Sequence, residues 1–73
     1  MTHEDLRDRA RAASTAYDRA VWVCATAREA YQADPTLSRF EALAFALEAR
    51  DLAYSARSKS TRAIREANIP REP

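Results

Sequence analysis

Residues 42–67 read ALAFALEARDLAYSARSKSTRAIREA. Small side chains recur in this stretch at alternating steps of four and three residues, a spacing that places them on one side of a single helix. The seam consists of Ala42, Ala46, Ala49, Ala53, Ala56, Ser60, Ala63 and Ala67. Because small residues let a second helix approach closely, the stretch predicts a long helix packed tightly on a partner helix.

The first half of the chain repeats this heptad spacing. Its seam consists of Leu6, Ala10, Ala13, Tyr17, Ala20, Cys24, Ala27 and Tyr31. The chain has no glycine, and its prolines lie near the middle, at Pro35, and beyond the second seam, at Pro70 and Pro73. These features predict an all-α fold, an antiparallel helical hairpin of two long helices joined by a short turn. We expect a single domain over 1–73, with helices over about 3–33 and 39–67, a turn at 34–38 and a tail at 68–73.

Polar residues at the expected helix ends predict how the helices begin and stop. Thr2 is expected to cap the first helix with its hydroxyl. Ser38 and Glu41 have the spacing of a capping box, which predicts the start of the second helix. Asn68 is expected to end that helix in a left-handed conformation.

The size and composition of the chain favour association with another chain. The 73 residues include one cysteine and one histidine, so neither an internal disulfide nor a four-ligand zinc site is possible. A core of this size gives only marginal stability without a disulfide or a bound metal. When the two seams face each other, large apolar residues on the other sides of both helices stay exposed to solvent, because one helix cannot cover every side of its partner. Large exposed apolar patches are rare on monomers and indicate an interaction. The expected protein-interaction residues are Val21, Trp22, Val23, Phe40, Phe45, Leu52 and Tyr54.

A second copy of the chain is the simplest cover for these residues, and it would give a homodimeric four-helix bundle. The alternatives are a different protein as the partner, or a hairpin that is stable alone. In length, single turn and small seam residues, the chain resembles the Rop-type helical-hairpin dimers, which are plasmid-encoded RNA-binding regulators. The resemblance implies the dimeric bundle, but a likeness of fold does not imply a function.

Few residues suggest chemistry. His3 lies at the expected frayed end of a helix, and Cys24 lies among alanines, where cysteine behaves as a small hydrophobe. Without glycine there is no phosphate-binding loop. We therefore expect no enzyme, with no catalytic residue, metal or cofactor. The net charge of +1 creates no general attraction to nucleic acid or membrane, and no apolar run is long enough to span a bilayer. The polar N-terminus is unlike a secretory signal, which favours a cytoplasmic protein.

One basic stretch leaves a second function open. Arg57, Lys59, Arg62 and Arg65 lie close together, and their hydroxyl-rich surroundings suit phosphate contacts. A structural explanation competes with this one, because cations near a helix C-terminus complement the helix dipole and the acids of the first helix, at 4, 5 and 8, lie across the hairpin. No aromatic residue is interleaved among the cations to stack bases.

The sequence thus predicts a small non-enzymatic protein-protein interaction or assembly module. A viral (phage-type) accessory or inhibitory protein is one form that such a module could take. The alternative is a nucleic-acid-binding regulator that uses the basic half of the second helix.

Overall fold

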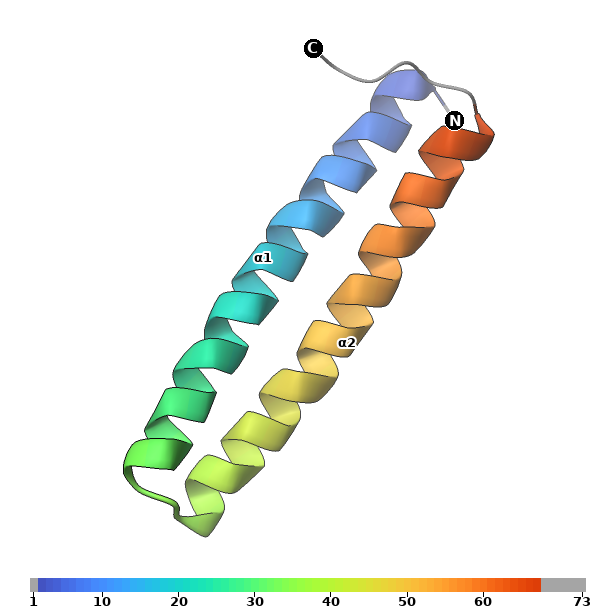
Figure 1. Cartoon of the computed structure of the whole chain (residues 1–73). Coiled ribbons are helices and arrows are strands. Elements are labelled where there is room, and N and C mark those ends of the chain that lie inside the picture. The colour runs from blue at the N-terminus through green and yellow to red at the C-terminus, as the bar shows by residue number, and fades with distance from the viewer. Residues whose placement is uncertain (1, 68–73) are drawn as a thin grey trace.

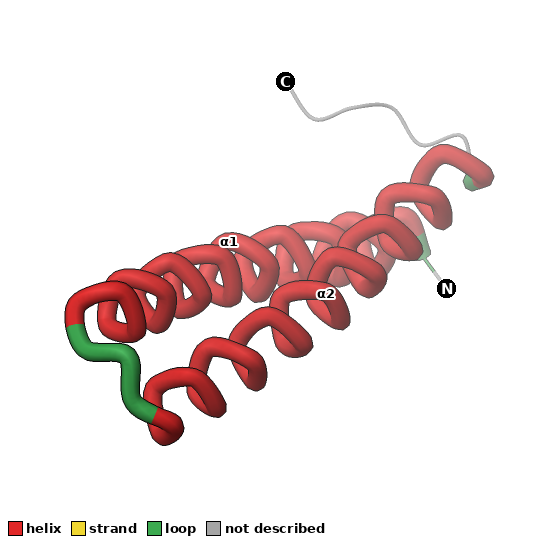
Figure 2. The backbone as a smooth tube through the Cα atoms, turned by 60° about the horizontal axis from the view of Figure 1, so that its bottom comes forward, coloured by secondary structure: helices red, strands yellow, loops and turns green. Residues whose placement is uncertain are grey.

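Two long helices form an antiparallel hairpin. The computed structural model describes residues 2–67, in which α1 spans His3–Ala33 and α2 spans Leu37–Glu66. A short loop joins them at one end, and the start of α1 lies beside the end of α2 (Figure 1). The two helices are inclined to one another rather than strictly parallel (Figure 2). The hairpin measures 48 × 20 × 14 Å. The predicted all-helical hairpin is confirmed for the described residues.

The start of α1 is capped as predicted. The Thr2 hydroxyl accepts a hydrogen bond from the backbone N–H of Asp5 at 3.1 Å, and the Asp5 carboxylate accepts one from the backbone N–H of Thr2 at 3.4 Å. Two of the backbone donors that a helix leaves unpaired at its start are therefore satisfied. Asn68, expected to end α2, lies outside the described residues.

The predicted start of α2 is wrong by two residues. The cap is Thr36, whose hydroxyl accepts a hydrogen bond from the backbone N–H of Arg39 at 3.2 Å, so Ser38 lies inside the first turn. The earlier start places Arg39 where its Nη1 donates to the Ala30 carbonyl at 3.0 Å, and its Nη2 lies 3.9 Å from the Asp34 carboxylate. The Ala30 carbonyl already accepts a hydrogen bond from the backbone N–H of Asp34 at 3.1 Å, so Arg39 supplies it with a second donor from α2. This contact across the loop favours Thr36 over the Ser38 capping box.

The α1 seam faces α2 as predicted, since all eight of its residues are buried or half-buried. Cys24, near the middle of the seam, is 2% exposed. Arg50 reaches it from α2, with 3.9 Å between Nη1 and the Cys24 sulfur.

The predicted contact face of α2 is correct in part. Of the seam residues, Ala46 is buried and Ala49, Ala53, Ser60 and Ala63 are half-buried, but Ala42, Ala56 and Ala67 are exposed. Leu43 and Leu47, which lie beside the seam, are half-buried as well. The helix is therefore turned slightly from the seam toward these leucines, because a leucine removes more apolar surface from water than an alanine does.

Aromatic pairs accompany this rotation. The rings of Tyr31 and Phe40 meet edge to face at 5.8 Å, and those of Tyr17 and Tyr54 lie tilted at the same separation. Such pairs add stabilisation beyond the area that they bury.

The contact face can be tested with two leucine substitutions on α2. Ala46 is 4% exposed, so Ala46→Leu forces extra methylenes between the helices and should lower the free energy of unfolding by about 1–3 kcal/mol. Ala44 is exposed on the same helix, so Ala44→Leu should change it by less than about 0.5 kcal/mol. Urea unfolding followed by circular dichroism, at one protein concentration, measures both. Equal effects would contradict the contact face.

The α2 cap can be tested separately. Thr36→Ala removes the hydroxyl that accepts from Arg39 and should reduce the free energy of unfolding by about 1 kcal/mol. Ser38→Ala is the matched control, and its effect should be much smaller because Thr36 occupies the capping position. If urea titrations show a larger loss of unfolding free energy for Ser38→Ala than for Thr36→Ala, Ser38 is the cap and the helix begins where the capping box predicts.

Candidate interaction surfaces

The hairpin leaves large apolar side chains in contact with solvent. All seven of the predicted interaction residues are exposed, and Phe45 and Leu52 reach 74% each. Leu37, exposed to a similar degree, was missed because it was expected to lie in the turn. Soluble proteins rarely expose contiguous apolar surface without a use for it. Which of these residues lie together therefore matters more than their number.

One group surrounds an apolar groove between the two helices, with a volume of about 320 Å³. Its lining residues are Ala16, Arg19, Ala20 and Val23 from α1, and Phe45, Ala46, Ala49 and Ala53 from α2. The α2 seam that was expected to face α1 thus supplies much of the groove. Leu52 lies seven residues after Phe45, which puts both on the same side of α2. We call the groove together with Phe45 and Leu52 the groove face.

The other predicted interaction residues lie elsewhere. Phe40 and Tyr54 contact the rings of Tyr31 and Tyr17, so part of their surface is already used within the hairpin. Trp22 does not line the groove, although its neighbour Val23 does, because successive helix residues point about 100° apart. The predicted set is therefore divided among different sides of the molecule.

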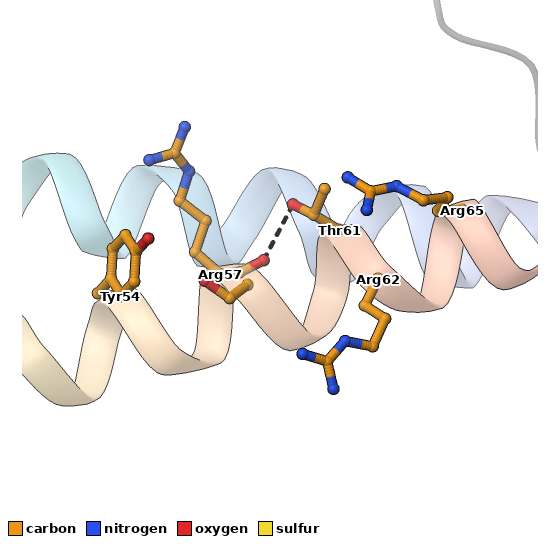
Figure 3. Close-up of a pocket in the computed structure, with 6 residues that line it drawn as sticks. Tyr54, Arg57, Thr61, Arg62 and Arg65 are labelled. Carbon is orange, nitrogen blue, oxygen red and sulfur yellow. Dashed lines mark hydrogen bonds between the residues drawn. The ribbon is translucent and has the colours of Figure 1, made fainter.

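A second, polar pocket of about 360 Å³ lies along the C-terminal half of α2 (Figure 3). It is lined by Tyr54, Arg57, Ser58, Thr61, Arg62 and Arg65, and we call it the basic pocket. The guanidinium of Arg57 lies 5.1 Å from the centre of the Tyr17 ring, a cation–π contact that holds it against α1. The Thr61 hydroxyl donates to the Arg57 carbonyl at 3.0 Å.

The basic pocket unites three of the four predicted cations. The fourth, Lys59, lines a different pocket with Leu6 and Arg9. The pocket also brings Tyr54 beside the cations, although the sequence offered no aromatic interleaved among them. Tyr54 precedes Arg57 by three residues, and this one-turn helical spacing is the signal that finds it.

The sequence suggested that the acids at the start of α1 could pair with the cations of the basic pocket, but no such ion pair forms among the described residues. Asp5 takes part in the α1 capping box, and Asp8 pairs with Arg11 at 3.4 Å. Within residues 2–67, neither Arg62 nor Arg65 forms an ion pair.

Neither surface contains an evident chemical centre. Within the described part of the chain, no three histidine, cysteine, aspartate or glutamate side chains lie together so that they could hold a metal ion. No described helix is long and apolar enough to cross a membrane.

Comparison with known proteins does not assign the chain to a family. No family model, no curated protein and no solved structure matches it. The two surfaces are therefore the guide to its function.

The position of Trp22 can be checked by fluorescence. The residue is 69% exposed and lies outside the groove, so its emission should resemble that of indole in water. Acrylamide should quench it efficiently at every protein concentration, and unfolding in urea should shift the maximum little. Blue-shifted emission protected from acrylamide in the folded protein would show that something covers this side of α1.

Proposed function

We propose that the protein is a non-enzymatic protein-protein interaction module that works as a homodimer, with the groove face of each copy packed on that of the other. The observation that carries the proposal is an apolar ridge beside an apolar groove on one face. Phe45 and Leu52 stand beside an alanine-lined channel, so a two-fold axis would set the ridge of each copy against the groove of the other.

The size of the face supports this proposal. A stable protein interface takes roughly 800 Å² from each partner, and a hairpin face of 48 × 20 Å is large enough to supply it. Alanines in the groove allow the close helix approach of a four-helix bundle. Burying the ridge would also supply apolar area that the hairpin alone lacks.

Charges at the edges of the groove face fit a second copy. Arg19 lines the groove from α1. Glu41 and Glu48 each lie four residues before a ridge residue, and this spacing places them on the same side of α2. None of the three forms an ion pair within residues 2–67. Contacts between Arg19 of one copy and these carboxylates of the other would fix how the two copies align, and would add little to the strength of dimerisation.

The proposal includes the setting in which the dimer acts. A cytoplasmic accessory or inhibitory role of the phage type is in keeping with a hairpin that presents surfaces for association. Trp22 would stay on the outside of such a dimer, where a further protein has access to it.

Light scattering coupled to size exclusion tests the dimer. At micromolar concentration the wild type should have about twice the monomer mass of 8.2 kDa. Phe45→Asp should halve that mass while circular dichroism still reports helix, because it places a charge in the apolar contact. Leu37→Asp is the matched control, since Leu37 is 72% exposed but does not line the groove, and its mass should equal that of the wild type.

Two results would reject this interface. A wild type with the monomer mass and intact helical dichroism means that the groove face serves a different protein. Equal dissociation by Phe45→Asp and Leu37→Asp means that the contact lies elsewhere.

A further inference from the structure

The basic pocket is a row of side chains along one side of α2. Tyr54, Ser58, Arg62 and Arg65 follow one another at steps of four, four and three residues, which keeps them on one side of the helix. At 1.5 Å per residue the row is about 16 Å long. In Figure 3, Arg57 extends toward α1 while Arg62 extends away from it, so these two guanidinium groups do not converge on one point. The arrangement suits an extended polyanion better than a single phosphate.

The cations of the row have unused binding capacity. The guanidinium groups of Arg62 and Arg65 form neither an ion pair nor a hydrogen bond within the described residues, and that of Arg57 is engaged through its cation–π contact with Tyr17. The lining residues include no carboxylate. An arginine carries five N–H donors in a planar fork that matches phosphate oxygens.

An aromatic surface lies at one end of the row. Tyr54 is 56% exposed, and its ring lies against the Tyr17 ring with 5.8 Å between centroids. A partly open ring beside a row of cations is the combination that single-stranded nucleic-acid sites use, in which the cations follow the backbone and the ring stacks on a base. A paired base inside a duplex does not offer its face for such stacking.

We infer that the basic pocket binds single-stranded nucleic acid, with Arg57, Arg62 and Arg65 on backbone phosphates and Tyr54 stacked on an unpaired base. This function goes beyond dimerisation and is independent of it. The basic pocket and the groove share no lining residue, because they lie on different sides of α2. A dimer formed through the groove face leaves the pocket of each copy open.

The test is fluorescence anisotropy with a labelled single-stranded oligonucleotide of roughly 16 nucleotides, across roughly 50 to 200 mM salt. Three phosphate contacts predict a slope of log affinity against log salt of about −2. The double variant Arg62→Gln/Arg65→Gln should flatten this slope by about 1.4, because two contacts are lost. The control is Arg9→Gln/Arg28→Gln, which removes the same charge outside the pocket and should leave the slope close to that of the wild type.

A second arm tests the stacking. Tyr54→Leu should weaken single-strand binding by roughly tenfold and leave the salt slope unchanged, since no charge is removed. The wild type should bind a duplex of the same sequence more weakly than the single strand. Because Tyr54 also contacts Tyr17, helical dichroism is checked first, and the arginine pair provides a test that disturbs no packed residue.

The outcomes separate this site from the dimer. Phe45→Asp should keep single-strand binding even if it is monomeric, and Arg62→Gln/Arg65→Gln should keep the mass of the wild type. The inference is overturned if the wild type does not bind at low salt, if the control pair lowers the slope as much as the pocket pair, or if the duplex binds as tightly as the single strand.

Discussion

The small buried stripe between two helices is the constraint on which the rest of the structure depends. Two helices in contact shield one side of each, and here alanine is the commonest residue on the shielded sides. Only Cys24 and Ala46 among the described residues are fully buried. So little buried area offsets only part of the conformational entropy lost on folding. Local interactions therefore matter more than in a larger domain, including the caps at Thr2 and Thr36 and the absence of glycine from either helix.

The choice of contact face on α2 shows where sequence periodicity stops being informative. The alanine seam and the stripe of larger residues beside it, which includes Leu43 and Leu47, both fit a helical period, so spacing alone cannot decide between them. The decision comes from ring contacts such as the one between Tyr17 and Tyr54, which exist only once the two helices are placed. On α1 there was no competing stripe, because Leu6, Tyr17 and Tyr31 belong to the seam and the consecutive residues 21–23 point to different sides of the helix. The existence and length of the helices and the face of α1 were therefore predictable from sequence, and the rotation of α2 was not.

The same distinction explains the α2 cap and the candidate sites. Thr36 and Ser38 are both good cap residues, and Ser38 had the better local pattern. The contact of Arg39 with the Ala30 carbonyl is tertiary, and no local pattern contains it. The predicted surface residues were exposed because exposure follows from an excess of large apolar side chains over available cover. Their division among separate sides follows from helical spacing, which already separates Phe45 and Leu52 from Phe40 and Tyr54 on α2. The spacing did not reveal which of these residues would lie beside the groove.

The rotation of α2 against α1 also makes it a helix with three different sides. One side contacts α1, the next supplies Phe45 and the alanines of the groove, and the third presents the row from Tyr54 to Arg65. Because the contact extends to Leu43 and Leu47, Phe45 and part of the alanine seam line the groove on one side of it, and Tyr54 lies against Tyr17 beside the arginines on the other. Both proposed surfaces therefore depend on how α2 is rotated against α1, although they use different residues and can be altered separately.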